Sequence, residues 1–349
     1  MELGNRIRAL RTDRGITQEQ LAQELHVTGQ AVSKWENGLS TPDIELLPRL
    51  SVFFGVTIDE LFAMTDDMHM ERIRNMISDE KFLSQHDFDY AEGFLIERMR
   101  DERRRADCLE LLCDLHVHRA QGHMARAGQY AREGLALEPG RKGLHSGLCA
   151  AAGGAHRDWY IHNHHALISY YQEFTQLHPD YGPGWQWLAD NLIADGRLEE
   201  ARAAVDRMER LMPGCLAPVY RGRVELAAGD RAAAREIWRE VGREYGNDWM
   251  AQLHLGDCMA RLCLYDEAVE HYRRALEMQP RPRYTDAPRS IAQIRGIQGR
   301  WAEAAQALDE VLALLRDEWG VSSGEGYDEP LRERDACLAR AGARGGAGA

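Results

Sequence analysis

Residues 17–38, TQEQLAQELHVTGQAVSKWENG, contain the start signals of two short helices separated by a tight turn. Thr17 and Gln20 form a capping box, in which the hydroxyl and the amide bond the free N–H groups at a helix start. The apolar residues that follow repeat at helical spacing until the pattern breaks before Thr28, which provides a second cap. The stretch therefore predicts a helix-turn-helix unit.

The second of these helices has two chemically different faces. Val32 and Trp35 are three residues apart and are expected to point into a core. Gln30, Ser33 and Lys34 fall on the opposite face. Gln can pair with adenine in the major groove, Lys can reach the acceptors of guanine, and Ser can serve either base. The row suits DNA base edges, and the alternative is a polar face that is only solvated.

The sequence around this unit carries further ordered motifs. A first helix with Leu3, Ile7 and Leu10 on one face is followed by RTDRGITQEQLAQEL, AVSKWENG, TPDIELLPRL and FFGVTIDEL. With these motifs, residues 1–62 resemble the Xre/Cro type of helix-turn-helix domain, the phage-repressor-like family. The resemblance implies a domain of five short helices that binds double-stranded DNA.

The same resemblance implies particular roles for side chains. Six of them are expected to contact DNA: Gln18 at a phosphate, Gln30, Ser33 and Lys34 at bases in the major groove, and Thr28 and Asn37 at the flanking backbone. Arg11 and Glu36 are expected to pair inside the domain. His26 stands at a turn where relatives usually carry glycine and where the backbone tends to need a positive φ.

The charge balance limits how such a domain binds DNA. The chain has 43 basic and 56 acidic side chains, and residues 1–62 hold six basic side chains against nine acidic ones. A domain that binds nucleic acid mainly by charge would be basic. We therefore expect a domain that recognises a DNA sequence mainly through base contacts. Its affinity for DNA should depend only modestly on salt concentration, because few phosphates can be neutralised.

Downstream, a short pattern ending in alanine recurs. It ends at Ala91, Ala127, Ala166, Ala201, Ala234, Ala268 and Ala304, at steps of 36, 39, 35, 33, 34 and 36 residues. A period near 34 residues is typical of tetratricopeptide repeats, in which alanine allows paired helices to approach closely. Prolines at positions 139, 179, 213 and 280 are expected to end second helices. We predict about seven units over residues 68–320, the alternative being an irregular helical bundle.

Repeat arrays of this kind present a concave groove lined by their first helices. Five residues of mixed polarity are expected to face it by the resemblance: Gln186, Asp190, Arg223, Asp257 and Gln293. They suit a peptide or a protein tail, and the alternative is that they are merely solvated.

The cluster His156, His162, His164 and His165 is a second candidate site, for zinc. No cysteine or carboxylate stands at a ligand-like offset, so a histidine-rich turn is the preferred interpretation. We expect neither a metal nor a cofactor.

The pattern predicts an all-α chain in three parts: residues 1–65 as the DNA-binding domain, 66–320 as the repeat domain, and 321–349 as a tail that is largely disordered apart from a short helix around residues 329–340. The chain has seven cysteines, an odd number, and no run of about 18 apolar residues. We therefore expect a cytoplasmic protein that is not bound to a membrane.

Motifs of common enzyme classes, such as GxSxG, HExxH and the phosphate-binding GxxxxGK[ST], do not occur in the sequence, so no enzyme is expected. The leading hypothesis is a sequence-specific transcriptional regulator that acts as a homodimer on two half-sites and senses a peptide or protein through its array. The alternative is a repeat-based interaction scaffold with weak or vestigial DNA binding.

Overall fold

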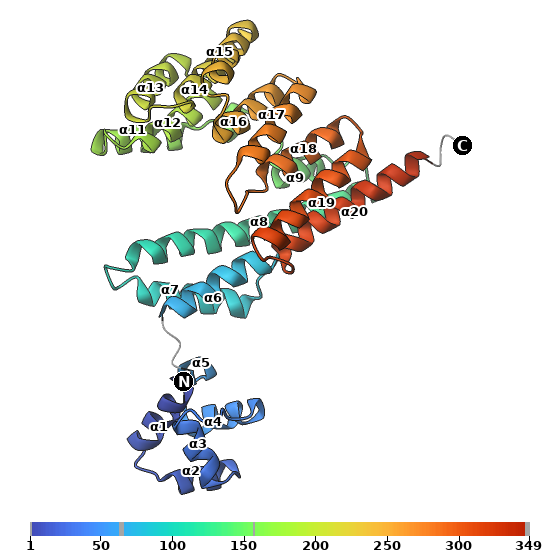
Figure 1. Cartoon of the computed structure of the whole chain (residues 1–349). Coiled ribbons are helices and arrows are strands. Elements are labelled where there is room, and N and C mark those ends of the chain that lie inside the picture. Colours follow the sequence, from blue (N-terminus) through green and yellow to red (C-terminus); the bar gives the residue numbers. More distant parts are fainter. Residues whose placement is uncertain (1, 63–65, 156–157, 346–349) are drawn as a thin grey trace. The chain divides into compact units, whose positions relative to one another are not determined.

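The computed structural model describes residues 2–62, 66–155 and 158–345, and the regular secondary structure in these ranges is helical (Figure 1). The all-α fold class predicted from the sequence is therefore confirmed. The chain divides into two compact units, Met1–Gly122 and His123–Ala349. Among the helices described, none combines the length and the apolar character that a bilayer crossing requires.

The N-terminal domain of the first unit has the five predicted helices. They are α1 (Glu2–Asp13), α2 (Gln18–Leu25), α3 (Gly29–Glu36), α4 (Leu47–Phe54) and α5 (Ile58–Leu61), with a 3₁₀ turn (Ile44–Leu46) before α4. Their inner faces share one core, in which Ile7, Leu21, Leu50 and Leu61 are fully buried. This core is the support on which α3 rests.

Local sequence signals set the ends of these helices. The predicted capping box is present at the start of α2 with Thr17 and Gln20, and a second capping box stands at the start of α5 with Thr57 and Glu60. The turn between α2 and α3 is made by His26, whose φ of 58° is left-handed. The positive φ expected at this histidine is thus confirmed.

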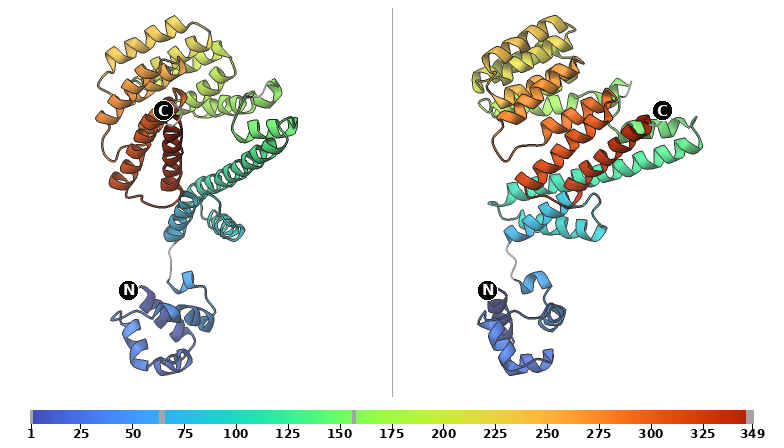
Figure 2. Two further views of the ribbon diagram at one scale, coloured as in Figure 1. Left: turned by 90° about the vertical axis from the view of Figure 1, so that its right-hand side faces the viewer. Right: turned by 45° about the vertical axis from the view of Figure 1, so that its right-hand side comes forward.

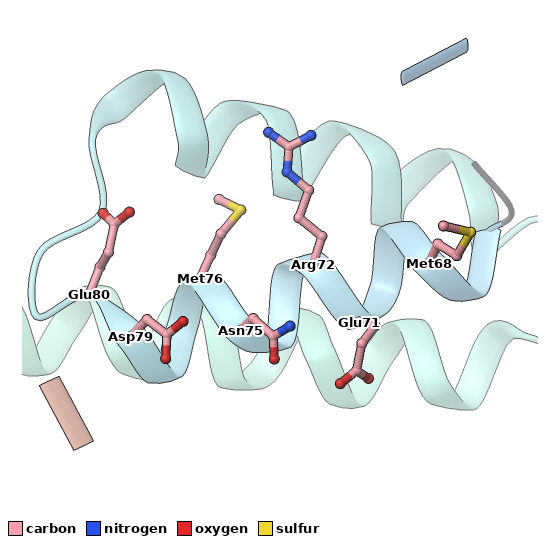
Figure 3. Close-up of a pocket in the computed structure, with 7 residues that line it drawn as sticks. All are labelled: Met68, Glu71, Arg72, Asn75, Met76, Asp79 and Glu80. Atoms are coloured by element: carbon pink, nitrogen blue, oxygen red, sulfur yellow. The ribbon is translucent and has the colours of Figure 1, made fainter. Parts of the chain in front are cut away.

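The same unit continues with α6 (Asp66–Asp79), α7 (Gln85–Arg98) and the start of α8 (Arg105–Leu137), which pack around a separate small core containing Ile73, Leu95 and Leu115. The helix α6 begins at Asp66, and residues 63–65 lie outside the described residues. Side chains of α6 and of Glu80 directly after it line an open pocket of about 480 Å³ (Figure 3). Its lining residues are Met68, Glu71, Arg72, Asn75, Met76, Asp79 and Glu80.

The second unit contains the end of α8 and the remaining helices (Figure 2). The first of these are α9 (Lys142–Ala151), α10 (Trp159–His162) and α11 (His165–Leu177). Four regular pairs follow: α12 (Gly182–Ala194) with α13 (Leu198–Leu211), α14 (Leu216–Ala227) with α15 (Arg231–Glu244), α16 (Trp249–Arg261) with α17 (Tyr265–Met278), and α18 (Asp286–Ile297) with α19 (Trp301–Glu318). The helix α20 (Glu325–Gly345) packs on α19.

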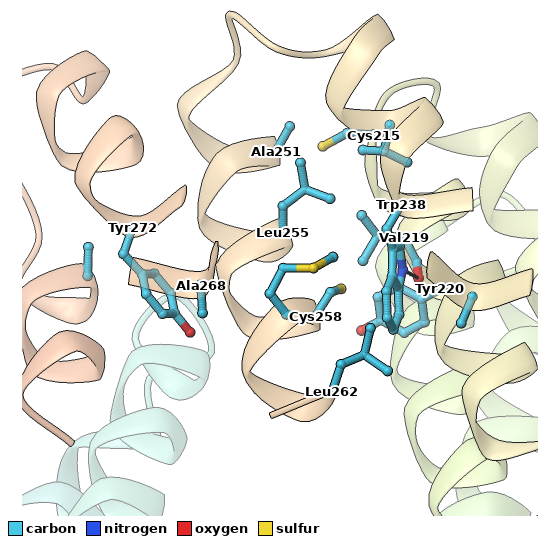
Figure 4. Packing of buried hydrophobic residues seen from close by; sticks show 14 of the residues in the cluster. Cys215, Val219, Tyr220, Trp238, Ala251, Leu255, Cys258, Leu262, Ala268 and Tyr272 are labelled. Carbon is cyan, nitrogen blue, oxygen red and sulfur yellow. Dashed lines mark hydrogen bonds between the residues drawn. The ribbon is translucent and has the colours of Figure 1, made fainter. Parts of the chain in front are cut away.

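Small residues allow the paired helices to approach closely. A Cβ at Gly222 of α14 would lie 2.2 Å from Nε1 of Trp238 on α15, and a Cβ at Gly256 of α16 would lie 2.6 Å from the Tyr272 ring on α17. The indole of Trp238 is buried and donates a hydrogen bond to the carbonyl of Val219 at 3.0 Å (Figure 4). Glycine on a first helix thus makes room for an aromatic ring on the second.

The predicted seven repeat units are reduced to four regular pairs in the described residues. Five of the seven periodic alanines are completely buried at 0% exposure, whereas Ala127 and Ala166 are exposed. Near Ala127 the predicted turn is missing because α8 continues for 33 residues. Gly122 lies inside that helix, where an isolated glycine costs only about 1 kcal/mol and need not end it.

The prediction that residues 321–349 are largely disordered is contradicted over most of its length. Residues 325–345 form α20, in which Pro330 is buried and Cys337 packs against the core of the array. The guanidinium of Arg340 lies 4.6 Å from the ring centre of Trp301 on α19. Packing against α19 therefore orders a segment whose glycines suggested disorder, and residues 346–349 lie outside the described residues.

Candidate nucleic-acid interface and repeat groove

The outward side of α3 carries the polar row predicted from the sequence. Gln30, Lys34 and Asn37 are exposed and Ser33 is half-buried, and their spacing of 30, 33, 34 and 37 places them on one side of the helix. Thr28 is exposed as well and caps α3, its hydroxyl accepting from the amide of Ala31 at 3.2 Å.

The opposite side of α3 is fixed to the core. Val32 is 0% exposed and Trp35 is 5% exposed, so the prediction that both are core residues is confirmed. Because these side chains leave α3 little freedom to rotate, the polar row has a defined direction.

A buried ion pair fixes the end of α3 to α1. Arg11 donates from Nε and Nη2 to the two carboxylate oxygens of Glu36, at 2.6 and 2.9 Å, as the resemblance implied. The Glu36 side chain is completely buried, and Gln18 of α2 donates to it at 2.8 Å. Burial raises the pKa of this carboxyl, but the hydrogen bonds from Arg11 and Gln18 and the charges of Arg11 and Arg8 outweigh it and hold the pKa below its ordinary value.

The same contacts show where two predicted DNA-binding residues stand. The amide of Gln18 is half-buried and already engaged with Glu36. Asn37 donates to the carbonyl of Ser33 at 2.8 Å and accepts from Arg8 at 3.3 Å. Both side chains are therefore held by the domain itself.

Two residues near this surface could not be placed from the sequence. Arg8 is half exposed and lies 3.5 Å from Glu36 as well as next to Asn37, so it places a cation beside the end of α3. The carboxylate of Glu19 lies against Gly29 at the start of α3, since a Cβ at Gly29 would be 2.0 Å from Oε2. No spacing signal links either residue to α3, because the contacts join different helices.

In the array, the predicted groove residues are partly brought together. Asp190 of α12 accepts from Arg223 of α14 at 2.7 Å and from the Tyr220 hydroxyl at 2.7 Å, and Gln186 donates to that hydroxyl at 3.3 Å. Burial, together with Asp190, raises the pKa of Tyr220 to about 12. A neutral tyrosine and an ion pair thus form one connected polar cluster.

The other two groove residues lie further along the array. Asp257 of α16 accepts from the Tyr272 hydroxyl at 2.6 Å, and Gln293 is exposed on α18. His254, also on α16, has its pKa lowered by burial and by the charge of Arg223, against the opposing charge of Asp257. The hydrogen bonds of the Asp190 cluster join α12 and α14, and Asp257 forms a separate contact between α16 and α17.

The histidine cluster shows ordinary hydrogen bonding where it is described. The ring of His162 lies 3.0 Å from the carbonyl of Asp158, and the backbone N–H of His164 donates to Asp195 at 3.0 Å. Among the described residues no three His, Cys, Asp or Glu side chains gather in a way that could hold a metal, and His156 lies outside them.

Comparison with known proteins assigns both parts of the chain. The helix-turn-helix family matches residues 7–61, and the tetratricopeptide repeat family matches residues 221–283 and 264–318. The HTH-type transcriptional activator BcrR of Enterococcus faecalis is 38% identical over 95 residues, which are 27% of this chain and 44% of BcrR. The chain therefore spans less than half of the length of that relative.

A second relative is shorter. An uncharacterized HTH-type transcriptional regulator of Methanocaldococcus jannaschii is 35% identical over 63 residues, which are 18% of this chain and 96% of the relative. A crystal structure of a tetratricopeptide repeat protein from Parabacteroides merdae ATCC 43184 aligns with 77% of this chain and 98% of its own, at 14% identity and a TM-score of 0.38. The assignment of the repeats rests on the family match.

Proposed function

The chain belongs to the helix-turn-helix family of transcriptional regulators, and we propose that it reads a DNA operator with the outward side of α3. The observation that carries the proposal is the row Gln30, Ser33, Lys34 and Asn37 on one side of a helix whose other side is buried. An amide and an ammonium group can each bond base edges in the major groove. Thr28 would contact the neighbouring backbone.

The electrostatics of the domain favour recognition by base contacts. The six basic and nine acidic side chains of residues 1–62 include the ion pair of Arg11 with Glu36, which offers no charge to phosphate. Lys34 within the polar row and Arg8 next to Asn37 keep their positive charges near the outward side of α3. We expect binding to weaken only modestly with salt, because the slope follows the number of neutralised phosphates.

Two copies would act together on DNA. The helix α3 has eight residues and its row can meet only a few base pairs, and readers of this kind gain specificity by placing two helices on half-sites about 34 Å apart. We place the protein in the cytoplasm, where its seven free cysteines would stay reduced.

The repeat groove is proposed to receive a peptide or a protein tail. The cluster of Asp190, Arg223 and Tyr220 offers a carboxylate, a guanidinium and a hydroxyl on adjacent first helices, where an extended chain could exchange hydrogen bonds with them. In the alternative function, a protein-interaction scaffold, the groove would bind the same kind of ligand, but DNA binding would play no part.

Selection of DNA from a random pool by the full chain tests the reading of an operator. We expect one enriched motif, and Gln30→Ala or Lys34→Ala should each lose about 1 to 3 kcal/mol of discrimination at one base pair. Gln23→Ala is the matched control, because Gln23 is exposed on the outer side of α2. Absence of any enriched motif would reject the DNA-reading function and favour the scaffold.

Screening an immobilised library of random heptapeptides with the full chain tests the groove. We expect a set of bound sequences whose retention falls at least about tenfold in Arg223→Gln, since a charge-assisted hydrogen bond would be lost. Arg239→Gln, an exposed position on α15, is the control. If no sequence is retained, or if both variants behave alike, the groove is not the sensing site.

A further inference from the structure

The helix α11 differs from the equivalent helices of the array in its charge. It occupies the place of a second helix directly before the first regular pair, yet it has one charged side chain, Glu173, among 13 residues. The second helices α13, α15 and α17 carry seven, seven and six charged side chains among 14 residues each. Those charges keep the outer surface of the array hydrated, and α11 lacks them.

Some apolar residues of α11 are buried against the array, and others remain exposed. Ile168 is fully buried against the array and marks the inner side. Leu167, Tyr170, Phe174 and Leu177 follow one another at steps of three, four and three residues and form a second apolar side next to it. Of these, Leu167 is 50% exposed, Tyr170 is 56% exposed and Leu177 is 76% exposed.

Aromatic contacts extend this second side beyond the end of the helix. The ring of Phe174 stacks on that of Tyr170 at 6.1 Å and meets the ring of Tyr181 edge-on at 6.1 Å. We call the set Leu167, Tyr170, Phe174, Leu177 and Tyr181 the α11 face. Because its rings hold one another, little side-chain entropy remains to be lost when another surface covers it.

A solenoid needs a polar outer surface on its terminal repeats to stay soluble, and a contiguous apolar surface on such an end marks an interaction site. We propose that the α11 face is the contact between two copies of this chain. The inference deepens the proposed function, on which it rests for the requirement that two readers act together.

Charge and area favour a second copy as the occupant. The whole chain carries a net charge of −13, so two copies repel each other over most surfaces. The α11 face itself contains no charged side chain, and a two-fold contact would bring it against itself without repulsion. Its exposed side chains amount to roughly 500 Å², a large part of the roughly 800 Å² per partner in a stable interface.

Sedimentation equilibrium of the full chain tests the inference. We expect a dimer for the wild type, and for Leu177→Glu and Tyr170→Glu a dissociation constant raised by more than about 100-fold, because each dimer would lose two buried contacts. Gln176→Glu places the same charge on the polar side of α11 and should leave the dimer intact. An unchanged thermal midpoint in each variant would show that the fold is preserved.

Several results would overturn the inference: a monomeric wild type, a Leu177→Glu variant that remains dimeric, or assemblies that grow beyond the dimer. The DNA selection described above separates this outcome from the proposed function. A dimer through the α11 face that enriches no motif rejects the DNA-reading function alone. A motif enriched by a monomeric wild type rejects the α11 contact alone.

Discussion

Replacing Arg11 by methionine tests how α3 is held in place. Methionine keeps most of the packing volume of the arginine stem but removes two of the three hydrogen bonds to the buried carboxylate of Glu36. Hydrogen bonds to a charged group contribute about 1.5 to 3 kcal/mol each, and breaking a buried ion pair typically costs about 3 to 5 kcal/mol. We expect a loss of about 3 to 5 kcal/mol in the stability of the N-terminal domain.

Hydrogen exchange of the full chain, followed by mass spectrometry on peptides from α1 and α3, measures this loss locally. The opening free energy of both peptides should fall in Arg11→Met, while peptides from the array should be unchanged. A double variant, Arg11→Met with Glu36→Leu, should recover part of the loss because no buried charge remains. A loss below about 1 kcal/mol in Arg11→Met would refute the role assigned to the pair.

The pH dependence gives an independent check with a definite sign. The folded-state pKa of Glu36 is lower than the unfolded value of about 4.3, so the carboxylate contributes stability that is complete above that pH. This contribution is lost as the pH falls through the folded-state pKa. The opening free energy of α3 should therefore decrease below about pH 4.3 in the wild type, and a Glu36→Gln variant that shows the same decrease would contradict this assignment.

Three further substitutions probe the backbone and packing of the fold. Cys263→Gly should raise the free energy of unfolding of the array by about 1 kcal/mol, measured by urea denaturation, because Cys263 has a φ of 59° that glycine adopts without strain. Gly222→Ala should lower stability by about 1 to 3 kcal/mol and change the near-ultraviolet circular dichroism of Trp238, whose buried indole would have to move. Thr17→Ala should cost about 0.5 to 2 kcal/mol, measured as faster hydrogen exchange in the first turn of α2, since its side chain would no longer cap the helix.

The sequence predicts best those features that depend on neighbouring residues. Capping boxes and the alanine of a helix pair are local signals, which is why the start of α2 and the burial of Ala201 were predicted correctly. The left-handed φ of Cys263 could also have been found, because it stands five residues before Ala268, where the units with Ala201 and Ala304 have Gly196 and Gly299. This shared spacing shows that the pair of α16 and α17 makes the same left-handed turn with Cys263 in place of glycine.

Features that depend on distant contacts were not predictable. The periodicity at Ala127 and Ala166 matched the repeat length, but whether a periodic alanine is buried depends on a partner helix that the spacing does not specify. In the same way, the salt bridge of Asp190 with Arg223 joins two first helices 33 residues apart. The sequence predicted that both residues face a groove, and the structure adds that they form an ion pair with one another.

The position of Gln18 also bears on how phosphate would be bound. Its amide would have to leave Glu36 to reach a phosphate, giving up a hydrogen bond to a buried charge, worth about 1.5 to 3 kcal/mol, for a contact in water that is worth less. The backbone N–H groups of Gln18 and Glu19 lie in the first turn of α2, where the helix supplies no partner. We therefore expect these N–H groups to bind the phosphate, and the Gln18 side chain to act by holding Glu36 in place. On this argument Gln18→Ala weakens DNA binding mainly by loosening α3, so a lower affinity in a filter-binding measurement should be accompanied by faster hydrogen exchange in the α3 peptide, whereas a lower affinity with unchanged exchange would mean that the side chain itself grips DNA.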